Sequence, residues 1–182
     1  MNAINETIIC AGFGGQGIMV MGKVLANAGM KKGLHVTWMP SYGAEVRGGT
    51  AHSAVRISTD PVGSPMVPVA GVAIIMNGPS LTKFVDRIDP GGLLILNTSM
   101  AEGKVERGDI EVVEAPLTEE AIKMVNVRVA NMVAIGIYVA RRGILAKDDF
   151  MGVIEEMAKG RAELIPINVK ALERGIEIGS GS

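Results

Sequence analysis

The sequence predicts an α/β fold of three layers, in which a mostly parallel sheet is covered by helices on both faces. Short apolar runs rich in β-branched residues alternate with longer segments of helical periodicity, and a glycine-rich turn directly follows the first run. Strands buried on both faces read as continuous apolar runs, as these do. The 182 residues fit one domain. We expect residues 1–178 to form it and residues 179–182 to be a disordered tail.

Six runs are expected to form strands. Five are short and apolar, and they cover residues 7–11, 35–39, 72–76, 93–97 and 110–114. Pro40 is expected to end the second of them. The sixth run, residues 50–58, alternates weakly between apolar and polar positions. This pattern is typical of a more exposed strand, and we expect it to be antiparallel at an edge of the sheet.

Helical periodicity follows the first strand and dominates the last third of the chain. The expected helices cover residues 16–32, a segment beginning at Thr118, and residues 131–142, 147–159 and 168–174. Thr118 and Asn131 are expected to be N-caps, and Asp148 and Asp149 to be first-turn charges. Gly33 is expected to be the C-cap of the first helix, and Gly175 to end the last one.

The composition excludes several classes of function. A formal net charge of -1 without a polybasic run argues against a nucleic acid or a membrane surface as partner. The longest apolar stretch, residues 129–140, is too short for a transmembrane helix, which needs ~20 residues. No basic segment precedes an apolar one at residues 1–6, so we expect a cytoplasmic protein.

The chain has little material for a metal site. Its single cysteine, Cys10, can form neither an intrachain disulfide nor a four-cysteine iron–sulfur cluster. The two histidines, His35 and His52, are far apart in sequence, and a lone histidine on a strand is more often structural than catalytic. We therefore expect no metal site and no catalytic residue in this chain.

The strongest functional motif is the glycine loop, residues 12–17, which lies between the first strand and the first helix. It fits the G-x-G-x-x-G pattern through Gly12, Gly14 and Gly17, and it adds Gly15 and Gln16. Glycines allow a tight turn and let backbone N–H groups approach an anion at a helix N-terminus. The alternative is a tight turn that binds nothing. The strand–turn–helix setting favours a Rossmann-like sheet and an anion contact.

A dinucleotide is not the favoured ligand. An NAD site needs an acidic residue at the end of the second strand to hold the ribose hydroxyls. Here that strand ends at Met39 and Pro40, and no acidic residue follows before Glu45. No arginine stands there for NADP either. The loop suits phosphate, but the residue that would recognise the ribose is missing.

A second motif covers residues 41–50 and follows the second strand. In an open α/β sheet this position lies at the carboxyl edge, beside the glycine loop. Tyr42 can stack on a planar group, and Arg47 can bind a phosphate through two hydrogen bonds or form an ion pair together with Glu45. The alternative is a solvated charged loop. At the same edge, residues 77–80 are interpreted first as a structural turn and only second as a ligand contact.

The two motifs together resemble the gamma subunit of 2-oxoacid:ferredoxin oxidoreductases. The resemblance rests on Gly12-Phe13-Gly14-Gly15-Gln16-Gly17 and Ser41-Tyr42-Gly43-Ala44-Glu45-Val46-Arg47-Gly48-Gly49. Asn131 before an Ala- and Ile-rich helix and the closing segment 168–175 are similar as well. Phe13 and the pair Gly48-Gly49 look more like the 2-oxoglutarate or branched-chain type than the pyruvate type. Ala44 stands where the family often has proline.

The resemblance implies a complex that converts a 2-oxoacid and coenzyme A (CoA) to acyl-CoA and carbon dioxide while reducing ferredoxin. It implies that thiamine diphosphate and iron–sulfur clusters belong to partner subunits: alpha, beta and a ferredoxin-like delta, or fused equivalents. The gamma subunit would help to bind CoA and to enclose the active site. Two alternatives stay open: a stand-alone Rossmann-type protein that binds a nucleotide or CoA, and a subunit that serves only assembly. The sequence determines neither the oxoacid nor the stoichiometry.

Overall fold

The computed structural model describes residues 3–41, 50–124 and 126–181. Within them the chain forms one six-stranded sheet in the order β2-β3-β1-β4-β5-β6. The strands are β1 (Asn5–Phe13), β2 (His35–Ser41), β3 (Thr50–Ser58), β4 (Ala70–Ile75), β5 (Ile88–Asn97) and β6 (Glu111–Ala115). The helices are α1 (Ile18–Lys31), α2 (Gly78–Phe84), α3 (Leu117–Lys123), α4 (Ala130–Arg142), α5 (Lys147–Ala158) and α6 (Leu164–Ser180), with 3-10 turns η1 (Val85–Arg87) and η2 (Val127–Val129).

The sheet is mostly parallel, as predicted. β1, β4, β5 and β6 pair in parallel, and they end at one edge, called the carboxyl edge below. β3 is antiparallel to both of its neighbours, β1 and β2. Its antiparallel direction was predicted correctly, but its edge position was wrong, because β2 pairs along its outer side. β2 is the edge strand on this side of the sheet, and it continues through Pro40 to Ser41. An edge strand tolerates a proline, whose missing N–H leaves no ladder bond unmade on the solvent side.

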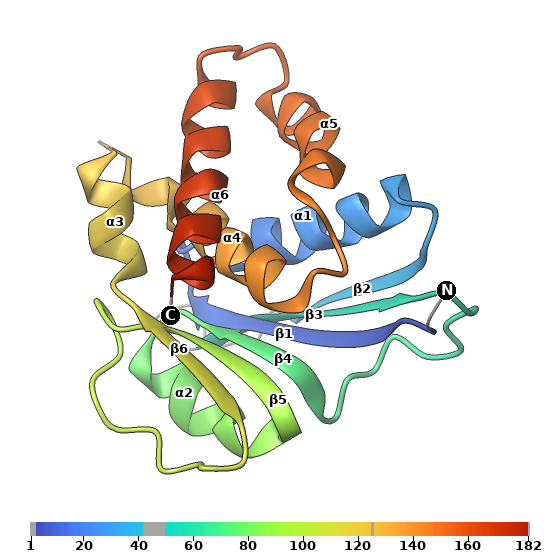
Figure 1. Ribbon diagram of the computed structural model, residues 1–182, viewed down its shortest axis with the longest axis vertical. Helices are drawn as coiled ribbons and strands as arrows, with labels where there is room; N and C mark the ends of the chain where they lie inside the picture. Colours follow the sequence, from blue (N-terminus) through green and yellow to red (C-terminus); the bar gives the residue numbers. More distant parts are fainter. Residues whose placement is uncertain (1–2, 42–49, 125, 182) are drawn as a thin grey trace.

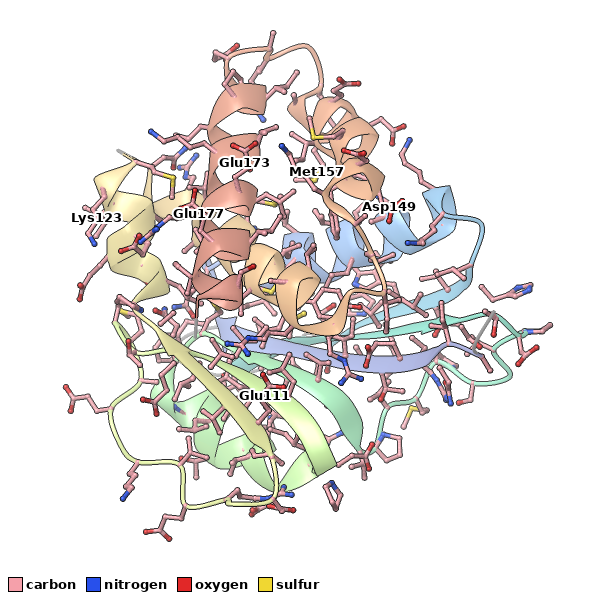
Figure 2. The ribbon with its side chains drawn as sticks, in the orientation of Figure 1. Glu111, Lys123, Asp149, Met157, Glu173 and Glu177 are labelled. Carbon is pink, nitrogen blue, oxygen red and sulfur yellow. The ribbon has the colours of Figure 1, made fainter. Side chains whose placement is uncertain are left out.

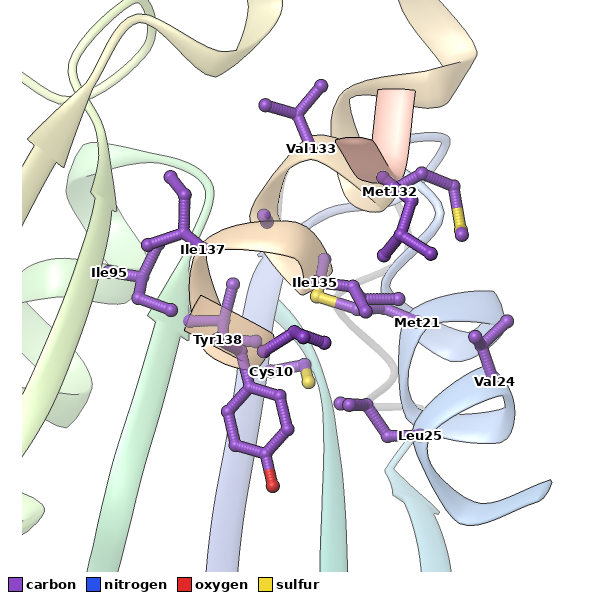
Figure 3. Packing of buried hydrophobic residues seen from close by; sticks show 14 of the residues in the cluster. Cys10, Met21, Val24, Leu25, Ile95, Met132, Val133, Ile135, Ile137 and Tyr138 are labelled. Carbon is purple, nitrogen blue, oxygen red and sulfur yellow. The ribbon is translucent and has the colours of Figure 1, made fainter. Parts of the chain in front are cut away.

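Helices cover both faces of the sheet, which confirms the three-layer prediction. Figure 1 shows α1, α4, α5 and α6 on one face and α2 on the other. Alternate residues of β1 divide between two cores: Ile8 and Cys10 pack toward α1 and α4, whereas Ile9 and Ala11 pack toward α2. On the first face, Tyr138 and Ile137 of α4 lie against the sheet (Figure 3). Apolar burial on both sides of β1, β4 and β5 explains their continuous apolar sequences.

Helices α4 and α6 pack closely against each other. A Cβ on Gly136 would lie 2.1 Å from the carbonyl oxygen of Leu172, and one on Gly175 would lie 2.0 Å from that of Val133. The two backbones touch because neither glycine has a side chain. Gly175 therefore lies within α6, and the prediction that it ends the last helix was wrong. Gly179 and Ser180, assigned to the tail, form the last turn of that helix.

Two predicted caps are also corrected. α3 begins at Leu117 with Pro116 as N-cap residue, so Thr118 lies in the first turn. α4 begins one residue before Asn131, which is buried in its first turn. In contrast, the first-turn role of Asp149 in α5 (Figure 2) is confirmed. Its carboxylate accepts hydrogen bonds from the Ala146 N–H at 2.7 Å and from Lys32 at 3.2 Å.

Candidate functional site

The glycine loop turns at the carboxyl edge, between the end of β1 and the start of α1. The N–H of Gln16 donates to the carbonyl of Phe13 at 3.3 Å. Gly15 has φ 92° and Gly17 has φ 75°, values in the left-handed region that favours glycine. Two of the predicted motif glycines thus occupy a conformation that other residues adopt only with strain.

The glycines of the loop fall into two groups according to whether a Cβ atom built on them would meet other atoms. A Cβ on Gly12 would lie 2.5 Å from Oε1 of Gln16 and 2.9 Å from Cβ of Met76. A Cβ on Gly17 would lie 2.7 Å from Nδ2 of Asn131. The close neighbour of Gly17 is therefore α4, which carries Asn131. Nothing lies within 4 Å of a Cβ built on Gly14 or Gly15, and both residues are exposed.

Gln16 attaches the glycine loop to the end of β4. Its Oε1 accepts the N–H of Phe13 at 2.6 Å, and its Nε2 donates to the carbonyl of Met76 at 3.1 Å. Nδ2 of Asn77 also donates to Oε1, at 3.5 Å. We predicted Gln16 among the residues that contact a ligand. The structure gives its side chain a positioning role for the loop, and its contact with a ligand stays a prediction.

Two buried asparagines, which the sequence left aside or interpreted as a turn, stabilise the same edge. Asn77 follows β4 and caps α2 by accepting the N–H of Ser80 at 2.9 Å. Asn97 ends β5 and donates to the carbonyl of Met76 at 3.2 Å and to the hydroxyl of Thr118 at 2.9 Å. Both asparagines stand directly after a buried apolar run, and this repeated position is the sequence signal that could have identified them.

The loop and the first turn of α1 present an environment suited to an anion. The N-cap residue of α1 is Gly17, which has no side chain to accept a bond from the N–H groups of the first turn. These groups, together with the partial positive charge of the helix terminus, favour a phosphate or carboxylate. Because Gly14 and Gly15 are open to solvent, an anion can approach without displacing a side chain.

The second motif lies almost entirely outside the described residues: Tyr42, Glu45 and Arg47 fall in the range 42–49. The first and last residues of the motif, Ser41 and Thr50, are described. Ser41 pairs with His52, and Thr50 pairs with Phe13 of the glycine loop. Both ends of the second motif therefore meet the carboxyl edge beside the glycine loop.

The two remaining candidates have structural surroundings. The ring of His52 lies 5.1 Å from that of Phe84, and burial, followed by the charges of Lys83 and Arg87, lowers the pKa of His52. Cys10 is fully buried, and burial raises the pKa of its thiol well above the usual range. In the part of the chain that the structure describes, no three His, Cys, Asp or Glu side chains gather where they could hold a metal ion. No helix of that part is long and apolar enough to cross a membrane.

Two curated relatives share substantial sequence with the chain. It is 37% identical over 169 residues to the ketoisovalerate oxidoreductase subunit VorA of Methanothermobacter thermautotrophicus. This match covers 92% of the chain but only 35% of VorA, so the chain spans about a third of that relative. It is 33% identical to the 2-oxoglutarate synthase subunit KorC of Methanothermobacter marburgensis, covering 79% of the chain and 81% of KorC.

Solved structures show the same fold. The 2-oxoglutarate:ferredoxin oxidoreductase of Magnetococcus marinus superimposes with a TM-score of 0.88 at 23% identity, over 98% of the chain and 31% of that protein. The gamma subunit of a keto/oxoacid ferredoxin oxidoreductase from Geobacter sulfurreducens superimposes with a TM-score of 0.82 at 24% identity, over 97% and 99%. Residues 7–178 match the family described as pyruvate ferredoxin/flavodoxin oxidoreductase.

Proposed function

Since the chain belongs to the pyruvate ferredoxin/flavodoxin oxidoreductase family, as a counterpart of its gamma subunits, we propose that it helps a 2-oxoacid:ferredoxin oxidoreductase to bind CoA. The complex would convert a 2-oxoacid and CoA to acyl-CoA and carbon dioxide while it reduces ferredoxin. The chain would enclose the active site without supplying a catalytic residue. Relatives named for ketoisovalerate and 2-oxoglutarate are in line with the substrate type that the motifs predicted.

The observation that carries this proposal is the glycine loop. Gly14 and Gly15 are exposed at the carboxyl edge, immediately before the start of α1, and Gln16 holds their turn against β4. CoA carries a diphosphate and a 3′-phosphate, which are the kind of anion that a helix N-terminus binds. The Magnetococcus protein, which shares the fold, is described with 2-oxoglutarate, CoA and succinyl-CoA bound.

Partner subunits would supply the cofactors. Thiamine diphosphate and iron–sulfur clusters are assigned to alpha, beta and ferredoxin-like delta subunits, or to fused equivalents. The chain's own thiol fits this division, because Cys10 is buried and a four-cysteine cluster needs three more ligands. Tyr42, Glu45 and Arg47 stay a predicted ligand or interface loop, and a cytoplasmic location stays a prediction.

The sheet topology weighs against a stand-alone dinucleotide-binding protein. In that fold the second strand lies beside the first, so that an acidic residue at its end reaches the ribose. Here antiparallel β3 separates β2 from β1. The sequence lacks the acidic residue that would recognise the ribose. In addition, the position beside β1 that the second strand has in a dinucleotide-binding fold is occupied here by β3. A role in assembly alone is the outcome that the following experiment separates.

The test is a matched pair of substitutions at Gly14. Gly15→Asp is unsuitable, because φ 92° would strain any side chain. Gly14→Asp and Gly14→Asn add side chains of nearly equal size into open space, and only the first adds a negative charge. In the complex reassembled with its partner subunits, Gly14→Asp should raise the KM for CoA about tenfold, equivalent to ~1.4 kcal/mol, whereas Gly14→Asn should change it little.

A second measurement checks the subunit assignment. The pure chain should show only background reduction of a viologen dye with 2-oxoacids and CoA. Turnover by the pure chain would contradict the assignment of catalysis to partner subunits. An assembled Gly14→Asp complex with an unchanged KM for CoA would show that the loop holds no phosphate and would favour the assembly role.

A further inference from the structure

Three basic side chains surround one buried aromatic ring on the α2 face of the sheet. Phe84, at the end of α2, is fully buried. Lys83 Nζ lies 5.7 Å and Arg87 Cζ lies 5.2 Å from the centre of its ring, and the His52 ring lies 5.1 Å from it. His52, Lys83 and Arg87 are called the basic cluster below. Their shared contact with Phe84 keeps three basic groups close together.

The contacts of the basic cluster with the rest of the described chain do not neutralise its charge. Lys83 donates to the hydroxyl of Thr50 at 3.2 Å. Arg87 donates through Nε and Nη2 to the carbonyls of Pro68 and Val67, at 2.8 and 2.7 Å. All three partners are neutral. Within the described ranges no carboxylate forms an ion pair with Lys83 or Arg87. Among the described residues, the side chains of Lys83 and Arg87 thus have neutral hydrogen-bond partners and keep their positive charge.

Asp86 stands between Lys83 and Arg87 in sequence. In the part of the chain that the structure describes, its carboxylate contributes to the raised pKa of the Arg107 guanidinium, after the larger effect of the hydrogen bond with Asp109. The positive charges of Lys83 and Arg87 also act on the imidazole of His52. After burial, which is the larger cause, they lower its pKa.

The sheet register places Lys83 beside the glycine loop. Thr50, which holds Lys83, is the direct partner of Phe13 between β3 and β1. Facing Cα atoms of antiparallel strands are about 4.5–5.5 Å apart. Lys83 reaches this pair from α2, whereas the glycine loop leaves it toward α1 on the other face. The two positive regions thus flank the same point of the carboxyl edge.

We propose that Lys83, positioned by Thr50 and Phe84 and accompanied by His52, forms a second anion subsite beside the glycine loop. A ligand at this edge then carries two separate anionic groups, one for each region. This inference rests on the proposed function and deepens it: CoA carries a diphosphate and a 3′-phosphate on one ribose. The diphosphate binds at the glycine loop and the 3′-phosphate binds at Lys83.

The first test observes the basic cluster directly in the full chain with inorganic pyrophosphate as probe. An anion beside Lys83 offsets the positive charges that act on His52. The pKa of His52, followed by NMR, should therefore rise, and the signals of its ring should shift. His35, exposed at the opposite end of β2, is the internal control and should not respond. Lys83→Ala should abolish the response of His52. An unchanged His52 at saturating pyrophosphate would overturn the proposal.

The second test compares CoA with 3′-dephospho-CoA in the assembled complex. Lys83→Ala removes an exposed side chain, and Lys170→Ala, on the opposite face of the sheet, removes the same charge as a control. Hydrogen bonds to charged groups contribute enough that Lys83→Ala should raise the KM for CoA about tenfold. It should leave the KM for 3′-dephospho-CoA unchanged, so the preference for CoA disappears. Lys170→Ala should preserve this preference.

The possible failures are distinguishable. If Gly14→Asp weakens the use of CoA while Lys83→Ala alters the use of neither ligand, the proposed function stands and the second subsite is wrong. If Lys83→Ala releases the chain from the complex and His52 ignores pyrophosphate, the basic cluster contacts an acidic partner surface instead.

Discussion

Gly17→Ala is expected to destabilise the protein through two separable effects. The residue has φ 75°, a left-handed conformation that costs an L-residue about 1–2 kcal/mol. Its new Cβ would also lie 2.7 Å from Nδ2 and 3.3 Å from Cγ of Asn131, a side chain that is itself buried in α4. Overpacking of this kind costs about 1–3 kcal/mol. The expected loss is therefore about 2–5 kcal/mol, a large share of the ~5–15 kcal/mol typical of a domain.

Gly33→Ala isolates the first of these effects. Gly33 has φ 80°, yet nothing lies within 4 Å of the position that a Cβ would occupy there, so its replacement adds backbone strain without crowding. We expect a loss of about 1–2 kcal/mol in the free energy of unfolding. The difference between the two alanine variants then measures the contact with α4, and urea unfolding followed by circular dichroism measures both.

Asn131→Ala completes a double-mutant cycle. In that background the crowding atoms are gone, so Gly17→Ala should cost only the strain that Gly33→Ala costs. The coupling free energy between positions 17 and 131 should be about 1–3 kcal/mol. Additive losses, or equal losses for Gly17→Ala and Gly33→Ala, would refute the view that α4 limits the space at the start of α1.

Two further predictions concern the helical layer. Gly136→Ala should lower the free energy of unfolding by about 1–3 kcal/mol, because its Cβ would meet the backbone of α6 at 2.1 Å. Gly152→Ala on α5 meets only the flexible end of Lys31, so it should be neutral or stabilise the protein by up to ~1 kcal/mol. Thermal unfolding of both variants measures the difference, and equal midpoints would contradict this prediction. Hydrogen bonds from Lys123 and Arg174 hold the pKa of the Glu120 carboxyl below its usual range, so their stabilisation is present above the unfolded pKa and is lost as the pH falls through the folded one. Arg174→Ala should therefore flatten the acid limb of stability against pH, while Lys170→Ala should leave its slope unchanged.

Local sequence patterns were sufficient for most secondary structure. The runs at 7–11, 72–76, 93–97 and 110–114 correspond to β1, β4, β5 and β6. For β1, β4 and β5 the reason is that a strand buried on both faces needs apolar residues at successive positions, whereas β6 is an edge strand with Glu111 and Glu114 exposed. The glycine loop was placed correctly between β1 and α1, since its glycines meet a local backbone requirement: Gly15 and Gly17 both have positive φ. A pattern that spans only a few residues can be interpreted without knowledge of the distant chain.

The tertiary structure alone decided the features that join distant segments. The place of β3 between β2 and β1 depends on pairing partners, which the alternation of residues 50–58 does not specify. Gly175 looked like a helix stop, because a glycine that ends a helix and one that lets two backbones touch are identical in sequence. The side chain of Gln16 bonds to Met76, 60 residues away, so the glycine loop's own sequence could not show that this amide positions the loop. The sequence by itself determined which segments become strands and where the glycine-rich turn lies, because both depend on short local patterns. Long-range contacts determined how the strands are ordered and which side chains hold the turn in place.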